Sequence, residues 1–431
     1  MSEIKNIYIE SYGCSANQNN AEILKGILTK SGFNIVINER LADILIINTC
    51  IVKGPTEKKM ERRISDLSKL NKSLIVAGCM PEVRSKELGK LKNVFLLGTH
   101  HYKDILKLIY DIRNKKYKIE EYLSYKKEIK LCLEKIKKNE VIGITQISEG
   151  CLGNCNFCIT KLAKGKLFSY PQDKIIENIK KDLKSGCKEI WITSQDNASY
   201  GLERGKRELP DLLEKILSLK ENFFVRVGMM NPNNVLPILN DLIRIYKNDK
   251  MFKFLHIPLQ SGSNRILKEM NRYYKVEDFL YIVKKFRKEI PNITISTDII
   301  VAYPSETEKD FKETIKVIKK IKPDIINYTK YWPMKGTKAA KEKQIDVKIA
   351  KERIKKLSEI CKKISEEENK KWINWKGKII IDEFKNNLLI ARNIFYKPIV
   401  LKTDDKKLLG KFVNVRVINS FTNYLLGEII K

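Results

Sequence analysis

The sequence has 431 residues, 43% of them apolar, and a formal net charge of +32 from 84 Lys and Arg against 52 Asp and Glu. This length predicts two or three domains, and the absence of an apolar run near the roughly 20 residues of a membrane span excludes an integral membrane protein. The start of the chain is no signal peptide, and nine cysteines in a lysine-rich chain favour reduced thiols or metal ligands over disulfides, so we expect a cytoplasmic protein.

Apolar strands alternating with helices begin the chain. Strands are predicted at residues 4–9, 33–37, 43–49 and 74–77, and helices such as residues 57–69 between them indicate a doubly wound parallel sheet. Cys14, Cys50 and Cys79 each come just after one of these strands, at the edge where open α/β sheets bind ligands. We therefore predict that the three converge on one crevice. The alternative is three buried core cysteines, but those would lie within the strands.

Two segments after this sheet have no assigned chemistry. His100 and His101 begin a helix predicted to end near residue 112, and we interpret them as a surface pair rather than metal ligands. Residues 113–136 are charged and have a helical pattern, which indicates a linker with a mostly solvated face. Residues 1–112 are thus predicted to be the first domain.

Three further cysteines, Cys151, Cys155 and Cys158, follow a strand predicted at residues 141–147. Structural zinc usually has four protein ligands, whereas this loop offers three thiolates and no fourth Cys or His nearby. A [4Fe-4S] cluster is normally held by four cysteines, so three leave one iron open to a substrate or cosubstrate. The spacing therefore favours such a cluster over the alternatives, a zinc loop or unliganded thiols.

The loop, with Phe157 before its last cysteine and Gly150 and Gly153 beside the first, resembles the cluster loop of the radical S-adenosylmethionine (SAM) superfamily. The resemblance implies that the open iron chelates the amino and carboxylate groups of SAM and that Phe157 packs near the adenine. It also implies that reduction cleaves SAM to a deoxyadenosyl radical, which is chemistry of the cofactor rather than of the protein.

Six strands alternate with helices in the central part of the chain, predicted as a domain over residues 137–369. They lie at residues 141–147, 189–193, 223–227, 252–256, 293–298 and 324–328. Six βα units predict an open parallel barrel lacking two strands of the full eight, with active-site residues at the carboxyl ends of its strands. We assign Gln195 and Arg226 to SAM binding, although ordinary turn chemistry would explain either. His256 has no assigned role.

A basic amphipathic helix is predicted at residues 345–371, followed by five short β runs. These lie at residues 378–382, 388–391, 399–401, 413–417 and 425–430 and indicate a small antiparallel β-barrel over residues 370–431. Residues 371–431 have 12 Lys and Arg against 5 Asp and Glu, interleaved with the aromatics Phe395, Tyr396, Phe421 and Tyr424. This pattern suits base stacking beside phosphates, so we predict RNA binding. The alternative for the aromatics is a plain barrel that buries them. The alternative for the charge is a lysine content set by A/T-rich codons.

The three predicted domains, in this order, resemble the methylthiotransferase family along nearly the whole chain. Matching motifs are YGC, NTC and AGC, ending at Cys14, Cys50 and Cys79, with HIPLQSGS at residues 256–263 and RNxxYKP at residues 392–398. The last lies in what would be the TRAM module, which binds RNA in this family. The run CITKLAKG at residues 158–165 looks most like the archaeal and eukaryotic branch. That branch converts N6-threonylcarbamoyladenosine at position 37 of tRNA to its 2-methylthio derivative.

This resemblance implies two [4Fe-4S] clusters, with the second on Cys14, Cys50 and Cys79. One SAM would give the radical that abstracts hydrogen from C2 of the modified adenine in the anticodon loop, the second cluster would host the sulfur, and another SAM would give the methyl group. An electron donor and a sulfur source are implied partners, and we expect a monomer.

Several alternatives remain open. The same chemistry could act on isopentenyladenosine in tRNA or on a ribosomal-protein aspartate. A radical SAM enzyme with one cluster and a non-catalytic Fe-S protein that binds RNA are the others.

Two runs depart from the family pattern. Residues 302–305 read AYPS where members usually have Gly-Phe-Pro-Gly, and residues 334–337 read MKGT in place of Arg-Pro-Gly-Thr. We expect both runs to lie away from the clusters and to affect the substrate pocket rather than the reaction class.

Overall fold

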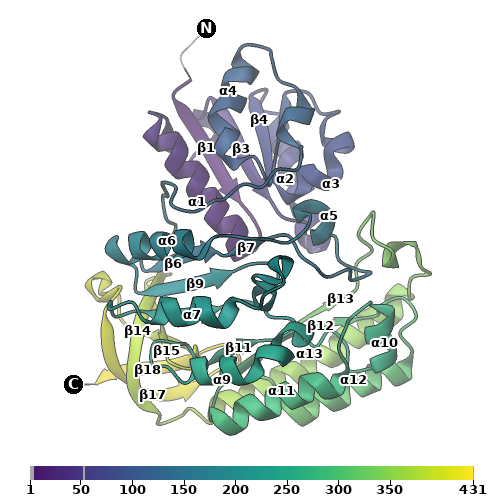
Figure 1. The fold of residues 1–431 in the computed structure, drawn as a ribbon, viewed down its shortest axis with the longest axis vertical. Coiled ribbons are helices and arrows are strands. Elements are labelled where there is room, and N and C mark those ends of the chain that lie inside the picture. The colour runs from purple at the N-terminus through teal and green to yellow at the C-terminus, as the bar shows by residue number, and fades with distance from the viewer. Residues whose placement is uncertain (1–3, 52–53, 431) are drawn as a thin grey trace.

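The computed structural model describes residues 4–51 and 54–430, so residues 1–3 and 431 of the predicted terminal domains lie outside the description. Along the chain it contains an α/β sheet domain, a half-barrel and a small β-barrel (Figure 1). Among the described residues, no helix is both long enough and apolar enough to cross a bilayer. All nine cysteines are free in the structure.

The N-terminal domain is a doubly wound parallel sheet, which confirms the prediction. Its strand order is β2-β1-β3-β4-β5, with strands β1 (Asn6–Ser11), β2 (Asn34–Val36), β3 (Ile44–Thr49), β4 (Ser73–Gly78) and β5 (Val94–Gly98). Helices α1 (Ser15–Lys30) and α4 (Ile105–Arg113) bury one face of the sheet, and α2 (Gly54–Ser68) and α3 (Cys79–Leu88) bury the other. Strand β5 was not among the predicted strands. The two layers of helices leave the carboxyl edge of the sheet free to form a site.

The histidine pair and the linker differ from their predictions. His100 and His101 are buried rather than on the surface, and helix α4 begins only at Ile105, after a 3-10 turn. Residues 114–141 contain one short 3-10 helix, η3 (Ile119–Tyr122), and no α-helix. Tyr122 lies in the N-terminal core and Leu131 in the core of the half-barrel. These apolar contacts with two domains, which helical periodicity does not reveal, hold the linker extended between them.

The central domain is an open half-barrel of six parallel strands, as predicted. One sheet has the order β10-β9-β6 and the other β11-β12-β13, and a parallel bridge between Val225 and Met251 joins them. The strands are β6 (Ile142–Gln146), β9 (Glu189–Thr193), β10 (Phe224–Val227), β11 (Phe254–His256), β12 (Thr294–Val301) and β13 (Ile325–Lys330). The edge strands β6 and β13 contact helices α1 and α13, which cover them. Covered edges cannot pair with other chains.

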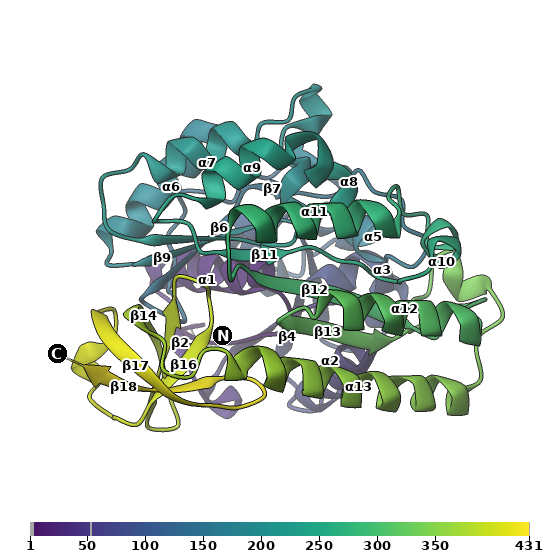
Figure 2. The same ribbon diagram turned by 90° about the horizontal axis from the view of Figure 1, so that it is seen from below.

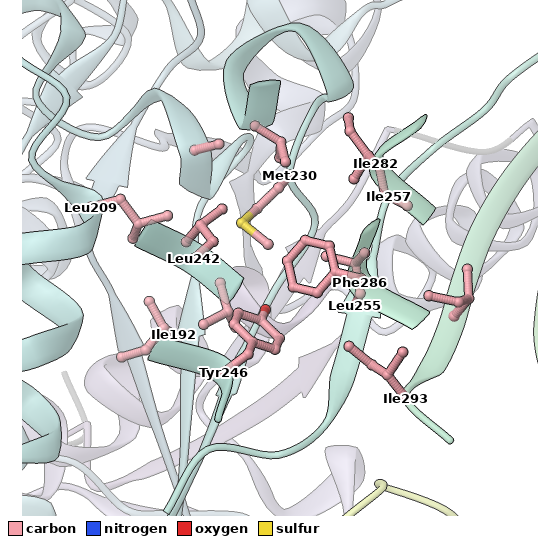
Figure 3. Close-up of a cluster of buried hydrophobic side chains, with 14 of the residues drawn as sticks. Ile192, Leu209, Met230, Leu242, Tyr246, Leu255, Ile257, Ile282, Phe286 and Ile293 are labelled. Atoms are coloured by element: carbon pink, nitrogen blue, oxygen red, sulfur yellow. The ribbon is translucent and has the colours of Figure 1, made fainter. Parts of the chain in front are cut away.

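Helices pack around the outside of the half-barrel and form its largest core. They are α6 (Gln172–Lys184), α7 (Leu209–Leu217), α9 (Leu239–Tyr246), α11 (Val276–Glu289) and α12 (Glu308–Ile321). Figure 3 shows part of this core, in which Leu242 and Tyr246 of α9 meet Leu255 of the strand layer and Phe286 of α11. Shorter helices α5 (Thr160–Lys164), α8 (Pro232–Val235) and α10 (Asn264–Glu269) lie in loops after the strands. The rigid outer core thus leaves the loops at the strand ends to form the site.

The tail is a long helix, α13 (Val347–Lys370), followed by a closed five-stranded barrel (Figure 2). Its strands are β14 (Lys376–Lys385), β15 (Leu388–Asn393), β16 (Pro398–Leu401), β17 (Phe412–Ser420) and β18 (Leu425–Ile430). The predicted barrel is confirmed, and one of its pairings, β16 with β18, is parallel. Tyr396, Phe252 and Phe254 form part of an apolar cluster that joins this barrel to the half-barrel.

Candidate active site between two cysteine loops

Cys14, Cys50 and Cys79 meet at the carboxyl edge of the N-terminal sheet. Cys14 caps the start of α1, Cys50 follows β3, and Cys79 is the first residue of α3. A Cβ atom at Gly13 would lie 3.0 Å from the Cys50 sulfur, and the Cys79 thiol interacts electrostatically with both other thiols. The sheet therefore brings the three predicted residues together.

The local backbone explains why these motifs have their particular residues. Gly78 has a φ of 98°, a left-handed conformation that lets the chain turn from β4 directly into α3. The Asn48 side chain of the NTC motif donates to the Asn17 carbonyl oxygen at 2.8 Å and accepts from the Tyr102 hydroxyl at 2.7 Å. The end of β3 is thereby tied to α1, which fixes Cys50 relative to Cys14.

Burial and the helix N-termini have opposite effects on the charge of the thiols in this crevice. Burial raises the pKa of the Cys79 thiol to about 12, so the free thiol is protonated at neutral pH. A bound metal centre would displace that proton. Cys14 and Cys79 stand at the N-termini of α1 and α3, whose partial positive charge stabilises thiolates and other anions.

The second trio, Cys151, Cys155 and Cys158, lies in a loop framed by the short antiparallel strands β7 (Ser148–Glu149) and β8 (Phe168–Ser169). The Gly153 N–H donates to the Cys151 sulfur at 3.2 Å. A Cβ atom at Gly153 would lie 3.3 Å from the Cys151 sulfur and 3.8 Å from the Cys155 sulfur. The loop therefore folds its cysteines around one small space, where Cys151 also interacts electrostatically with Cys158.

Within the described parts of the chain, no three His, Cys, Asp or Glu side chains are grouped closely enough to hold a single metal ion. Each trio offers three thiolates, whereas a structural zinc site usually has four protein ligands. A [4Fe-4S] cluster held by three cysteines keeps one iron open. The donor set of each trio therefore fits such a cluster.

The two cysteine loops face each other across the domain boundary. Ile159 and Ala163, from the second loop and helix α5, pack into the same apolar cluster as Cys50 and Cys79. Helix α5 also contacts α3 directly. Both trios thus lie at the junction of the N-terminal sheet and the half-barrel.

Three buried charged residues and a neutral histidine lie at this junction and are called here the junction ion cluster: Lys130, Glu149, Lys164 and His100. The Lys130 and Lys164 ammonium groups lie 2.7 Å and 2.8 Å from the same Glu149 oxygen, and His100 Nδ1 lies 3.8 Å from the other. Burial alone would raise the pKa of Glu149, but the attraction of the two lysines outweighs it and lowers that pKa. The same burial lowers the pKa of His100 to about 4, so its ring is neutral at pH 7. The sequence pattern did not predict that these residues meet, because the pairs are 15 to 49 residues apart in the chain.

The three residues assigned to SAM lie in different environments. Phe157 packs against the apolar cluster that contains Tyr303 and Tyr331, and the Gln195 Oε1 atom is buried without a protein hydrogen-bond partner. Arg226 lies about 5 Å from the centroids of three rings, Trp191 at 5.0 Å, Phe254 at 4.9 Å and Tyr396 at 5.2 Å. It pairs in register with Trp191, in the middle of β9, whereas Gln195 lies two residues beyond the end of that strand. This position favours a structural role, and its contact with SAM stays a prediction.

Unsatisfied polar atoms gather at the carboxyl end of the half-barrel. Ser194 Oγ, Gln195 Oε1, Asn197 Oδ1 and Gln260 Oε1 are buried and have no hydrogen-bond partner in the protein. Buried polar atoms are almost always paired, so this set fits the site of a polar ligand. SAM, with its ribose hydroxyls and its amino and carboxylate groups, is of that kind. His256, by contrast, is paired with Asp298 at 2.9 Å.

Both departures from the family pattern lie closer to the cysteine loops than expected. Met334 packs into the apolar cluster of Cys50 and Cys79, and Tyr303 packs beside Phe157. The expectation that the two runs lie away from the clusters is therefore wrong. Their loops fold back from the ends of β12 and β13 onto the junction, a path that strand order alone does not specify.

The aromatic side chains of the tail divide into two groups. Tyr396 is buried against the half-barrel and Phe395 packs on Trp372 with ring centroids 5.0 Å apart, so neither is free to stack on a base. Phe421 is exposed and stacks with Tyr424 at 4.7 Å. The predicted stacking role thus fits only Phe421 and Tyr424.

Three family models match successive parts of the chain. They are described as Uncharacterized protein family UPF0004 at residues 6–98, Radical SAM superfamily at residues 145–318 and TRAM domain at residues 379–430. The fold is also similar to a solved structure of the radical S-adenosylmethionine methyltransferase TsrM from Kitasatospora setae, with a TM-score of 0.58 and 10% identity. That similarity covers 78% of this chain and 77% of TsrM and shows a shared fold.

Curated relatives match over almost the whole chain. A Pyrococcus horikoshii protein named "Probable threonylcarbamoyladenosine tRNA methylthiotransferase" is 41% identical over 428 residues, 98% of this chain and 99% of that protein. A Methanocaldococcus jannaschii protein of the same name is 40% identical, over 98% and 97% of the two chains. The Homo sapiens "Threonylcarbamoyladenosine tRNA methylthiotransferase" is 34% identical, over 99% of this chain and 74% of the human one. The chain therefore belongs to the threonylcarbamoyladenosine tRNA methylthiotransferase family of radical SAM enzymes.

Proposed function

We propose that this protein converts N6-threonylcarbamoyladenosine at position 37 of tRNA to its 2-methylthio derivative. The observation that supports this most directly is the meeting of two cysteine trios at one domain junction. The chain is also 41% identical to the Pyrococcus horikoshii protein named as a probable threonylcarbamoyladenosine tRNA methylthiotransferase. An aromatic C–H is too weak an acid for a side-chain base to remove, so the reaction needs a radical, and general base catalysis alone would not suffice.

The cysteines are proposed to hold two [4Fe-4S] clusters. Cys151, Cys155 and Cys158 would bind the cluster that takes SAM, and Cys14, Cys50 and Cys79 would bind the second. When bound, the first cluster and SAM supply the radical and the methyl group, and the second supplies a place for sulfur. The helix N-termini at Cys14 and Cys79 would stabilise the negative charge of the thiolates.

The protein's other residues are proposed to orient the ligands and keep water out. Ser194 and Gln195 have the unsatisfied polar atoms to position SAM, with Phe157 beside the adenine. The junction ion cluster would hold the N-terminal sheet against the half-barrel, so that the distance between the two centres is constant. A constant distance matters because a radical must form next to the atom that later receives sulfur.

The basic tail is proposed to bind the tRNA. Lysines on the small barrel would follow the phosphates, and the exposed Phe421 with the half-buried Tyr424 beside it would stack on unpaired bases. The anticodon loop is single-stranded, so its modified base can be turned into a pocket. We further propose domains at residues 1–112, 137–369 and 370–431 with the linker 113–136, a cytoplasmic monomer, and an electron donor and a sulfur source as partners.

Mass analysis of tRNA nucleosides tests the function. Cells that lack the protein, complemented with the wild-type chain, should contain the 2-methylthio threonylcarbamoyl nucleoside, and the Cys151→Ala and Cys14→Ala variants should not restore it. Cys132→Ala, a cysteine outside both trios, is the matched control and should restore it. A nucleoside level that does not depend on the protein would reject this substrate, and a change in 2-methylthio isopentenyladenosine would favour that alternative.

A second assay separates an enzyme from a non-catalytic Fe-S protein that binds RNA. The reconstituted protein, reduced with dithionite without oxygen, should cleave SAM to deoxyadenosine. Cys151→Ala should abolish this cleavage, whereas Cys14→Ala should keep it and lose only sulfur insertion. The absence of deoxyadenosine from the wild-type reaction would favour the non-catalytic protein.

A further inference from the structure

The loop with Cys155 is held from one side by the last residue of helix α10 and the three residues after it, called here the grip segment (residues 269–272). The Asn156 N–H donates to the Met270 carbonyl oxygen at 3.1 Å, and the Asn156 side chain donates to the Glu269 carbonyl oxygen at 2.7 Å. In the other direction, the Asn271 side chain donates to the Asn154 carbonyl oxygen at 2.7 Å. Three hydrogen bonds thus fix the backbone on both sides of Cys155.

The fourth contact of the grip segment is to the cysteine sulfur itself. Arg272 Nη1 donates to the Cys155 sulfur at 3.1 Å, and its Nη2 donates to the Asn231 side-chain oxygen. Its guanidinium carbon lies 5.0 Å from the centroid of the Tyr274 ring. The Tyr274 hydroxyl donates to the carbonyl oxygens of Pro258 and Leu259, so the ring under the guanidinium is fixed as well. Arg272 is therefore aimed at one sulfur atom.

Asn231 is itself held in place by a buried carboxylate. Asp196, which is 1% exposed, accepts from the Asn231 N–H at 3.0 Å, from the Asn231 side chain at 2.8 Å and from the Asn234 side chain at 2.7 Å. A chain of hydrogen bonds therefore runs from the loop after β9 through Asn231 and Arg272 to Cys155. This chain links the cluster loop to the strand ends where SAM is proposed to bind.

We propose that Arg272 is a positioning residue that holds Cys155 and raises the reduction potential of the cluster bound there. The inference rests on the proposed cluster at Cys151, Cys155 and Cys158. Hydrogen bonds to the cysteine sulfurs are among the factors that set the potential of such clusters. Reduction adds negative charge, and a guanidinium, which is always charged in proteins, stabilises the reduced cluster more than the oxidised one. Removing Arg272 should therefore make the cluster harder to reduce.

The test is an EPR-monitored redox titration of the full-length reconstituted protein. Arg272→Met should shift the reduction equilibrium of the SAM-binding cluster by about tenfold toward the oxidised form, equal to about 59 mV for one electron. Arg272→Lys keeps a positive charge and should recover part of the shift. Lys268→Met, which removes an exposed charge from helix α10 next to the grip segment, should leave the potential unchanged. If Arg272→Met leaves the cluster unstable, Asn231→Ala, which removes the oxygen that holds Arg272 Nη2 and one donor to Asp196, should give a smaller shift in the same direction.

Two results would overturn the inference. One is an unchanged potential in Arg272→Met together with weaker SAM binding, seen as a loss of the SAM-induced change in the EPR spectrum, because Arg272 would then act on SAM. The other is an equal shift in Arg272→Met and Arg272→Lys, which would point to general loosening of the loop. A wild-type protein that assembles no SAM-responsive cluster would instead contradict the proposed function.

Discussion

Ala302 and Ser305 lie in the left-handed region of backbone space, with φ values of 57° and 73°. These are the two positions where proteins with the Gly-Phe-Pro-Gly run have glycine. A Cβ atom is disfavoured in this conformation, whereas glycine adopts it readily. The departure from the family pattern is thus a source of local backbone strain next to Tyr303 and Phe157.

Replacing these residues by glycine should stabilise the protein. Each of Ala302→Gly and Ser305→Gly is expected to gain about 1 kcal/mol, because relief of the left-handed strain exceeds the entropy lost by a glycine. Thermal unfolding followed by circular dichroism measures the change. Ala350→Gly, in the helix α13, is the matched control and should lose about 1 kcal/mol instead. A lower melting temperature in Ala302→Gly would show that the turn is not strained.

Glu82, in helix α3, should make the stability depend on pH. Burial raises the pKa of its carboxyl from the ordinary 4.5 to about 7, even though the carboxylate accepts the Thr99 N–H at 2.7 Å. The folded state then binds a proton more tightly than the unfolded state, so this contribution is complete below about pH 4.5 and is lost as pH rises through 7. Glu82→Gln cannot titrate and should lose less stability between pH 5 and pH 8, by about 2 kcal/mol. Parallel pH profiles of the two melting temperatures would contradict the shift.

At the scale of elements, the RNxxYKP motif of the tail serves to dock the small barrel on the half-barrel. Lys397 pairs with Asp324 at 2.7 Å, and the Thr294 hydroxyl donates to the Phe395 carbonyl oxygen at 2.6 Å. Tyr396 inserts between the two domains beside Arg226. The family resemblance places this motif in an RNA-binding module, but most of its side chains contact other parts of the chain.

Two aromatic substitutions should separate docking from RNA binding. Phe421→Ala removes an exposed ring, so tRNA affinity should fall by about 1–3 kcal/mol with the melting temperature unchanged. Tyr396→Ala removes a buried ring from the interface, and amide hydrogen exchange should rise in strands β15 and β16. Filter binding of tRNA at several salt concentrations measures the first effect. Unchanged affinity in Phe421→Ala would contradict RNA stacking on this ring.

The elements that sequence analysis predicted well are those with one simple environment. Strands of continuous apolar residues, such as β3, and amphipathic helices, such as α6, have patterns set by a single core. The trio of Cys14, Cys50 and Cys79 could be grouped because parallel strands end at one edge. Cluster ligation itself stays a prediction.

The linker, His100 and Arg272 have environments set by contacts between distant segments, and such contacts leave no periodic pattern of apolar residues in the sequence. The linker was predicted to be solvated because it has many lysines. Lys130 is nevertheless fully buried, and its charge is compensated by the Glu149 carboxylate, 19 residues away. His100 was predicted to lie on the surface but is also buried, beside the same Glu149 carboxylate. Arg272 was not singled out, because its partner Cys155 is 117 residues away.

At the scale of the whole molecule, the junction ion cluster joins three segments of the chain. Lys130 comes from the linker, Glu149 and Lys164 from the half-barrel, and His100 from the N-terminal domain. The Lys130 ammonium group also donates to the Thr99 carbonyl oxygen at 2.5 Å. Burial of these charges is tolerated because each has an opposite charge or hydrogen-bond partner.

Removing one member should weaken the whole junction. Lys130→Met is expected to destabilise the protein by about 3–5 kcal/mol, since it removes one partner of a buried ion pair. Hydrogen exchange should increase on both sides of the junction, near Thr99 and near Glu149. Lys174→Met breaks an exposed pair with Glu177 and should cost less than about 1 kcal/mol. Equal effects of the two substitutions would argue against a joining role.

The small barrel at the end of the chain is closed, so each of its five strands has a neighbour on both sides. Unpaired strand edges are where proteins exchange strands and grow into fibrils. A highly basic protein reaches a high local concentration on a polyanion, and a high local concentration favours fibril growth. The closed ring offers no edge to a neighbouring copy, so this domain can accumulate on nucleic acid without seeding aggregates through its strands.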